Sequence, residues 1–260
     1  MSPVIQITHP SPAVGVITIN RPEKRNALDE AAWAALAQGL ETLGEAPDVR
    51  VIVLTGVPGA FCAGDDIHAF SCVKDDPAAR DRYWNTIMRS YAALSRLPVP
   101  IIAAIDGPCV GGGMTLALRA DFRVIGQRAV FSVPPAKLGL VYPADSTARL
   151  ASAIGTQAAR YMIYTAEPVD AAQAAAFGLG IGGVAEDPLE AALTLAAKIA
   201  GKAPLTISAA KRVFDGLDGQ IPEGLGEEIE ARTRAAEASA DYTEGVAAFA
   251  EKRAPKFTGR

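Results

Sequence analysis

The chain has 260 residues, half of them hydrophobic and 21% charged, and its formal net charge is −4. This length fits one sizeable globular domain with a smaller appendage, and the interspersed charges form no basic stripe that would indicate a nucleic-acid partner. No stretch approaches the roughly 18 uninterrupted apolar residues of a membrane span, and the three cysteines form no disulfide framework, so a cytoplasmic setting is predicted.

The first half of the chain alternates strand and helix signals. Val4–Thr8 and Gly15–Asn20 are predicted to be paired strands, and Asp29 is expected to cap a helix that runs to about Leu43. The apolar runs 49–56 and 99–107 have the length of strands buried on both faces. A helix is expected between them, at about 78–96, and the glycine-rich segment after the second run also predicts a helix. Two short strands are then predicted, at 122–126 and 129–133.

After Asp145 the hydrophobic period becomes helical, and only the strand-like piece 180–186 interrupts it. The predicted helices cover about 146–153, 156–165, 170–176, 187–201, 204–216, 222–238 and 243–252. Strand and helix in repeated order predict an α/β fold, here followed by a helical C-terminal region.

Three consecutive glycines, Gly111 to Gly113, open the apolar helix within "DGPCVGGGMTLALRAD". Each glycine weakens a helix interior by about 1 kcal/mol relative to alanine, so the sequence needs a reason for them. One interpretation is close backbone packing. The other is that an oxygen approaches the unpaired N–H groups of the helix N-terminus, where the macrodipole favours negative charge. No lysine follows, so a phosphate-binding P-loop is excluded.

A second glycine loop, "GVPGAFCAGDDIHAF" at 56–70, directly follows the buried strand signal. Active sites in such folds gather beyond the carboxyl ends of the strands, so both glycine segments are placed to face one ligand. Two N–H donors from separate loops would form an oxyanion hole. A metal site is the rival interpretation for the second loop. The spacing of its Cys, Asp and His residues matches no zinc pattern, and no metal is predicted.

Four segments taken together resemble signatures of the enoyl-CoA hydratase/isomerase (crotonase) superfamily, in order along nearly the whole chain. They are "ITINRPEKRNALD", "GAFCAGDDIHAF", "GPCVGGGMTLALRAD" and "EGVAAFAEKRAPKF". The resemblance implies a crotonase-like spiral of ββα turns in residues 1–200, which binds an acyl-CoA thioester. It also implies a helical C-terminal trimerisation region in 201–260, a homotrimer or hexamer, and no cofactor beyond the coenzyme A of the substrate.

The resemblance also assigns site residues. The N–H groups of Asp65 and Gly112 would stabilise the enolate oxygen of the thioester. The stretch from Ala63 to His68 would line the pantetheine of coenzyme A, while Arg25 and the Lys256/Phe257 end would lie near its nucleotide. The full set of residues expected to contact coenzyme A is Arg25, Ala27, Ala63, Asp65, Asp66, Ile67, His68, Gly112, Lys256 and Phe257.

The sequence departs from the family pattern at both of its catalytic glutamates. The first position, one helical turn after the central glycine, is Thr115, and the second is Pro135. A threonine hydroxyl is a poor base at neutral pH, and proline has no proton to exchange. Ordinary hydration between two carboxylates is therefore in doubt, and so is isomerisation by the second glutamate.

Two other residues are candidates for the proton transfer. Tyr142 lies in "FSVPPAKLGLVY", which is similar to the corresponding part of methylmalonyl-CoA decarboxylase, although that relative has a histidine where this chain has Asp65. Asp145 is a carboxylate at the start of a helix. The simpler interpretations are a pocket-wall aromatic for Tyr142 and a capping or first-turn acid for Asp145.

Three functions remain open from these residues. The chain is a decarboxylase or isomerase-like enzyme that uses Tyr142 or Asp145, a weak hydratase with a repositioned acid, or an inactive acyl-CoA binding protein. Addition of water or loss of carbon dioxide would make the enzyme a lyase. Thr115 is interpreted as a helix-facing filler in the simpler view, and Asp66 is expected to fix its loop through backbone hydrogen bonds.

Overall fold

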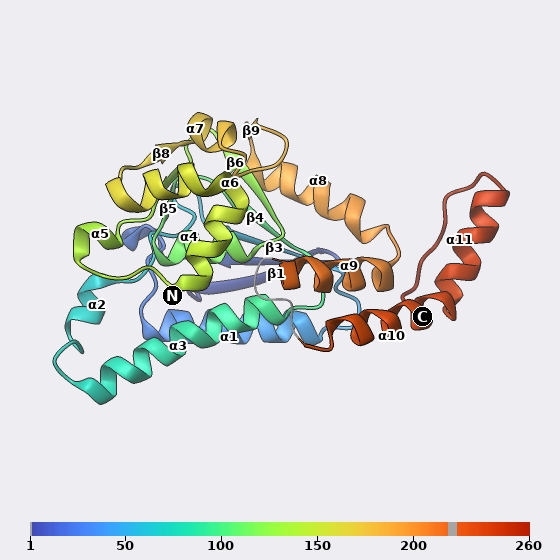
Figure 1. The fold of residues 1–260 in the computed structure, drawn as a ribbon, viewed down its shortest axis with the longest axis horizontal. Helices are drawn as coiled ribbons and strands as arrows, with labels where there is room; N and C mark the ends of the chain where they lie inside the picture. The colour runs from blue at the N-terminus through green and yellow to red at the C-terminus, as the bar shows by residue number, and fades with distance from the viewer. Residues whose placement is uncertain (1, 218–222) are drawn as a thin grey trace.

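The computed structural model describes residues 2–217 and 223–260 (Figure 1). Within these residues the strands are β1 (Ile5–Ser11), β2 (Val14–Ile19), β3 (Val51–Gly56), β4 (Ile101–Ile105), β5 (Pro108–Val110), β6 (Phe122–Gly126), β7 (Val130–Ser132), β8 (Val169–Asp170) and β9 (Val184–Ala185). The helices of the first part of the chain are η1 (Pro22–Lys24), α1 (Glu30–Glu45), α2 (Ile67–Ser71), α3 (Pro77–Arg96), α4 (Gly112–Arg119) and α5 (Pro135–Leu138). Those that follow are α6 (Ala144–Thr165), α7 (Ala171–Ala176), α8 (Pro188–Ala200), α9 (Pro204–Leu217), α10 (Leu225–Glu237) and α11 (Ala240–Ala250).

The strands form two sheets, and the chain steps between them. The larger sheet has the order β1-β2-β3-β4-β6-β9, and the smaller has β5-β7-β8. β1 and β2 are antiparallel, whereas β2, β3, β4 and β6 are parallel neighbours. From β4 onward a strand in the large sheet is followed by a strand in the small sheet and then by a helix: β4, β5, α4 and then β6, β7, α5. This alternation is the predicted spiral of ββα turns.

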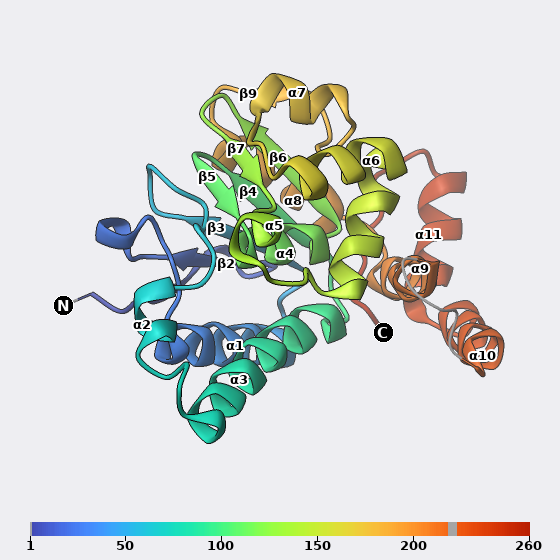
Figure 2. The ribbon, with the colours of Figure 1, turned by 60° about the vertical axis from the view of Figure 1, so that its left-hand side comes forward.

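Alternate residues of the parallel strands bury against opposite layers. On β3, Val51 and Val53 pack toward α8, while Ile52 and Leu54 face the core that contains α1. The same alternation holds along β2 and β4, and each face is apolar because the sheet has helices on both sides. Figure 2 shows α1 and α3 side by side on the face opposite α8. The loops that follow the carboxyl ends of β3 and β4 are therefore attached to strands that are packed on both faces.

The structure confirms the first predicted helix and its cap. The Asp29 side chain accepts a hydrogen bond from the Ala32 N–H, at 2.9 Å, at the start of α1. The short elements β5, α2 and α5 were not predicted, because pieces of three to five residues carry no periodic signal. The two helices predicted at 146–153 and 156–165 form α6, which begins two residues earlier and is broken at Gly155, where φ is 75° and ψ is 154°.

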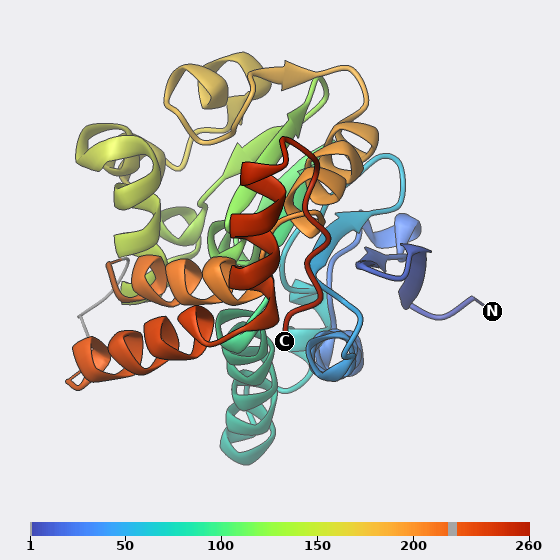
Figure 3. The ribbon, with the colours of Figure 1, turned by 90° about the vertical axis from the view of Figure 1, so that its right-hand side faces the viewer.

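The C-terminal region consists of α9, α10 and α11, and α10 and α11 extend away from the body of the molecule (Figures 1 and 3). α10 begins at Leu225, and residue 222 of its predicted span lies outside the described residues. α11 begins at Ala240, three residues before its prediction, because Ser239 caps it. Among the described residues, no helix has the length and apolarity needed to cross a bilayer.

Two polar contacts hold the C-terminal region against the core. The ammonium group of Lys211 on α9 donates to the Asp121 carboxylate, at 2.9 Å, and the same carboxylate accepts from the N–H of Ile101 on β4. The Arg50 guanidinium donates to the carbonyl oxygens of Ala200, at the end of α8, and of Phe257, in the returning tail. Both contacts start from residues next to the strands of the large sheet.

Candidate functional site

The two glycine loops touch one another. A Cβ atom added to Gly64 would lie 3.0 Å from the amide nitrogen of Gly112 and 2.7 Å from the carbonyl oxygen of Val110. One added to Gly113 would lie 2.1 Å from the carbonyl oxygen of Cys62. Side chains cannot fit between these backbones, so close packing explains Gly64 and Gly113. It also brings the loop after β3 against the first turn of α4.

The peptide N–H of residue 65 takes no part in the bridge that holds its loop, and it lies within reach of the residue's own carboxylate. Leu28 forms a parallel bridge with Asp65. The two hydrogen bonds of the bridge join Leu28 to the residues on either side of Asp65: the Leu28 N–H donates to the Gly64 carbonyl, and the Asp66 N–H donates to the Leu28 carbonyl. In a parallel bridge the central residue's own N–H then faces the other side. On that side lies the start of α4.

Gly112 is the first residue of α4, so its N–H has no acceptor within the helix. Gly111 precedes it with φ 53° and ψ −110°, a conformation suited to glycine, and lets the chain turn sharply into the helix. Two N–H groups thus lie at the junction of the loops, one from each. An oxyanion is the ligand that such paired backbone donors stabilise.

Side chains from α1 and α3 surround this junction. The Trp33 indole N–H donates to Asp65 Oδ1 at 3.1 Å, and the Trp33 and Tyr91 rings meet edge to face, with centroids 5.5 Å apart. A Cβ added to Gly112 would lie 3.1 to 3.2 Å from the Trp33 ring, Asp65 Oδ2 and the Tyr91 hydroxyl. Burial raises the pKa of Asp65 to about 6, and the Trp33 hydrogen bond opposes this rise.

Thr115 and Tyr142 also lie at this site. The Thr115 hydroxyl donates to the Tyr142 oxygen at 2.8 Å, and Tyr142 lies 3.5 Å from the Gly111 carbonyl oxygen. Both side chains are buried. Burial raises the pKa of Tyr142 above its ordinary value, so at neutral pH this residue is a neutral hydroxyl. Pro135 is the first residue of α5, a position that suits proline because its missing N–H would be unpaired there.

Asp145 lies in the first turn of α6 and forms an ion pair with Arg119. Its position agrees with the simpler interpretation, a first-turn acid, and its catalytic role stays a prediction. The Arg119 guanidinium is buried, lies 4.5 Å from the centre of the Tyr91 ring, and donates to Ser146 Oγ at 3.1 Å. The Arg119 Nε atom is buried and has no hydrogen-bond partner among the described residues. The sequence signal for Arg119 was a lone charge in an apolar helix, seven residues after Gly112.

Asp66 holds the loop as predicted. Its carboxylate accepts hydrogen bonds from the N–H groups of His68 and Ala69 at the start of α2, and it lies 3.1 Å from the Arg21 guanidinium. Burial favours protonation of this carboxyl, but the backbone donors and the nearby cations outweigh burial and lower the pKa.

Most of the residues expected to contact coenzyme A lie around this loop. The Ala63 N–H donates to the Arg25 carbonyl, Ala27 is buried beside them, and Ile67 and His68 are exposed on α2. Lys256 and Phe257 lie elsewhere. Figure 1 places the C-terminus at the opposite end of the long axis from α2. Within one chain, the structure does not bring this tail to the predicted nucleotide site, because the tail folds back along α11 and is held by Arg50.

The cysteines of this region have no arrangement suited to a metal. Among the described residues, no group of three or more His, Cys, Asp or Glu side chains could hold an ion. Cys62 and Cys109 are buried and pair through their backbones. Burial raises the pKa of Cys62 to about 12, so it remains a neutral thiol.

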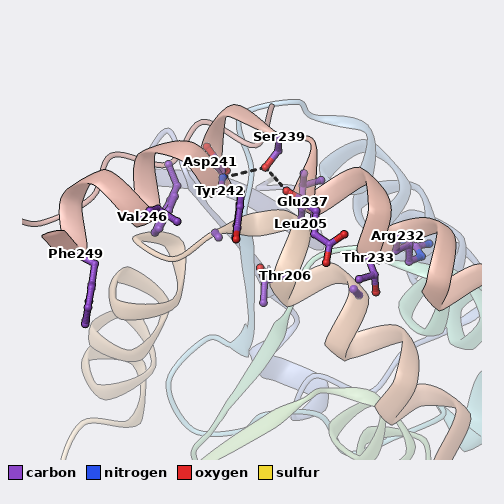
Figure 4. Close-up of a pocket in the computed structure, with 15 residues that line it drawn as sticks. Leu205, Thr206, Arg232, Thr233, Glu237, Ser239, Asp241, Tyr242, Val246 and Phe249 are labelled. Atoms are coloured by element: carbon purple, nitrogen blue, oxygen red, sulfur yellow. Dashed lines mark hydrogen bonds between the residues drawn. The ribbon is translucent and has the colours of Figure 1, made fainter.

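A separate pocket of about 570 Å³ lies between α9, α10 and α11 (Figure 4). Its wall includes Leu205 of α9, Phe257 of the tail, and Tyr242, Val246 and Phe249 of α11. The three α11 side chains are more than half exposed, at 58%, 55% and 88%. The C-terminal region therefore presents a hollowed apolar surface, far from the junction of the glycine loops.

Comparison with known proteins places the fold. The family model for enoyl-CoA hydratase/isomerase matches residues 10–260. The 2,3-dehydroadipyl-CoA hydratase of Escherichia coli is 36% identical over 247 residues, which cover 94% of this chain and 95% of that protein.

Solved structures give the same result. An enoyl-CoA hydratase/isomerase family protein from Hyphomonas neptunium superposes with a TM-score of 0.90 at 38% identity and covers 99% of this chain and 98% of its own. The enoyl-CoA hydratase of Bacillus anthracis also superposes at 0.90, with 30% identity over 99% of this chain and 100% of its own. The fold is therefore the crotonase fold predicted from the motifs. The chain belongs to the enoyl-CoA hydratase/isomerase family, whose members process acyl-CoA thioesters.

Proposed function

We propose that this protein binds an acyl-CoA thioester and holds the thioester oxygen between the N–H groups of Asp65 and Gly112. The observation that carries the proposal is the approach of the loop at Gly64 to the amide nitrogen of Gly112. As a proton leaves Cα, or a carboxylate departs from it, charge builds on this oxygen. Two fixed N–H donors, one at a helix N-terminus, would stabilise that charge, and each is worth about 10²- to 10³-fold in rate.

The coenzyme A portion would lie over the segment from Ala63 to His68, beside Arg25. Lys256 and Phe257 would reach the nucleotide from a neighbouring subunit, since their own site lies at the other end of the chain. This favours a homotrimer or hexamer assembled through the C-terminal helices. The exposed apolar side chains of α11 support this arrangement, because surfaces of this kind mark interfaces. We place the protein in the cytoplasm, as its sequence predicts.

The reaction would be an acyl-CoA lyase or isomerase reaction without the usual pair of glutamates. Thr115 of α4 is hydrogen-bonded to Tyr142, and neither is a base at neutral pH. Asp145 is engaged by Arg119. Decarboxylation is the second candidate, because the Tyr142 hydroxyl lies next to the start of α4 and could donate a proton to the enolate. An ionised Asp65 beside the substrate carboxylate opposes that candidate.

The test is a pair of substitutions at Gly112. Gly112→Ala and Gly112→Pro both add a Cβ at the same crowded point, but only proline removes the N–H. Purified protein is incubated with crotonyl-CoA and with methylmalonyl-CoA, and consumption of each thioester is measured. We expect the proline variant to be at least about 10²-fold slower than the alanine variant.

Equal rates for the two variants would remove the Gly112 donor from the mechanism. Tight acyl-CoA binding without turnover of either thioester would support the third function, an inactive binding protein. Failure to bind any acyl-CoA would overturn the proposal.

A further inference from the structure

The side chain of Asp65 points into the same site in which its backbone N–H would hold the thioester oxygen. Asp65 Oδ2 lies 3.2 Å from the point where a Cβ of Gly112 would be, and Oδ1 accepts the Trp33 indole N–H at 3.1 Å. The carboxyl is therefore held beside the N-terminus of α4 by two neutral donors, the Trp33 indole N–H and the residue's own backbone N–H, which a bound thioester oxygen would take over. Among the described residues, no lysine or arginine nitrogen forms a salt bridge with it.

The groups around this carboxyl leave its charge largely uncompensated. Trp33 of α1 is fully buried, and Tyr83 and Tyr91 of α3 face it as neutral phenols whose pKa values its charge helps to raise, after burial. Cys62, in the same loop, is a neutral thiol. The Arg119 cation lies against the Tyr91 ring. Burial in this setting gives Asp65 a pKa of about 6, which suits a group that exchanges a proton near neutral pH.

We infer that the Asp65 carboxylate is the catalytic base of this site, a role that rests on the proposed acyl-CoA function. In the step, a carboxylate oxygen takes the proton from Cα of the thioester. The electron pair of the broken C–H bond forms the C=C bond of the enolate, and the carbonyl π pair moves to the oxygen between the two N–H donors. Returning the proton to carbon reverses the step and regenerates the carboxylate.

The transfer also keeps two negative charges from building up side by side in the site. Before the step the negative charge is on Asp65, and after it the charge is on the thioester oxygen. The site carries one negative charge throughout, so two full charges never face each other. The position also compensates for the missing glutamates, because Thr115 and Pro135 cannot accept a proton at neutral pH.

The experiment measures exchange of the α-protons of butyryl-CoA in D₂O by NMR, which needs no knowledge of the physiological substrate. Asp65→Asn keeps the backbone N–H of residue 65 and an oxygen for Trp33, but it cannot take a proton. We expect exchange to fall by about 10²-fold or more while butyryl-CoA affinity, measured by calorimetry, changes only a few-fold. The wild-type rate should rise with pH through about 6 and then level off.

Two further variants make the result specific. Glu190→Gln, the same acid-to-amide change at an exposed position of α8, should leave exchange unchanged. Asp65→Glu should restore part of the lost rate, since it returns a carboxylate with a longer reach.

The contrary outcomes are distinct. Wild-type exchange in Asp65→Asn, or exchange and affinity lost together, would overturn the inference and indicate no role or a structural one. If the wild-type protein binds butyryl-CoA without exchanging its α-protons, the inference fails while acyl-CoA binding stands. If it does not bind, the proposed function itself fails.

Discussion

The core and the C-terminal helices of this protein bury their apolar side chains in different ways. In the core, both faces of the central part of the large sheet are covered, by α8 on one side and by α1 and its neighbours on the other, and the residues of β2, β3 and β4 are almost completely buried. On α11, Tyr242, Val246 and Phe249 remain in solvent. The core is complete in one chain, whereas the C-terminal region leaves an apolar surface exposed, which is the surface that the proposed oligomer would bury.

The largest expected effect is on the free energy of unfolding, and it compares a glycine of the core with a glycine of the C-terminal region. Gly113→Ala would place a Cβ 2.1 Å from the Cys62 carbonyl oxygen, a backbone atom that cannot move aside without disturbing the loop junction. We expect a loss of about 3 kcal/mol or more in the free energy of unfolding, measured by urea denaturation.

Gly245→Ala in α11 is the matched control. Its Cβ would make an ordinary contact, 3.5 Å from the Phe257 ring, and alanine favours a helix over glycine, so stability should hold or rise by about 1 kcal/mol. Equal destabilisation by both changes would contradict the view that the core is packed more tightly than the C-terminal region.

The next effect concerns assembly. Phe249→Asp puts a charge on the exposed apolar face of α11, near the end of the helix, and we expect the proposed oligomer to dissociate to a monomer in light-scattering measurements of mass. The helical circular dichroism signal should persist, because Phe249 is 88% exposed in the single chain and contributes little to its packing.

Trp84→Ser serves as the control, since Trp84 is also a large exposed aromatic but belongs to α3, a helix that Figure 1 shows away from α11. Its mass should match that of the wild type. A wild-type protein that is already monomeric at micromolar concentration would refute the interface.

The smallest expected effect is the pH dependence of stability that Asp65 causes within the core. The folded protein holds the Asp65 proton up to about pH 6, whereas an unperturbed aspartate releases it near 3.8. The unfolded state therefore binds fewer protons in this window, and stability falls as pH rises from about 4 to about 6. Asp65→Asn should abolish this fall and be more stable than wild type at pH 7 by about 2 kcal/mol, by urea denaturation across the pH range.

A variant that is less stable than wild type at pH 7 would show that the carboxylate contributes to folding. Glu190→Gln should reproduce the wild-type pH dependence between 4 and 6, because its side chain is exposed.

Much of the fold followed from the sequence because the long elements carry strong periods. The apolar runs gave β3, β4 and β6, and Asp29 marked the start of α1. The short elements β5, α2 and α5 depend on tertiary contacts, such as the backbone pairing of Cys62 with Cys109, that no local pattern encodes.

The site was predicted less completely. Glycine spacing indicated both loops and their meeting, because only a close approach of backbones requires glycine there. The groups that surround them, Trp33 and Tyr91, came from helices that read as ordinary core, and their role depends on how α1 and α3 pack. Lys256 and Phe257 were assigned by resemblance, and the path of the tail takes them away from the loop.

The bridge between Leu28 and residue 65 has a consequence for how this site can change over time. The loop is anchored to Leu28 by the carbonyl oxygen of Gly64 and the N–H of Asp66, so the bridge itself uses neither the amide nor the side chain of residue 65. A substitution there can alter the chemistry of the pocket without loosening the anchor. A single substitution at residue 65 can therefore change which side chain faces the substrate, while the hydrogen bonds to Leu28 keep the loop in place.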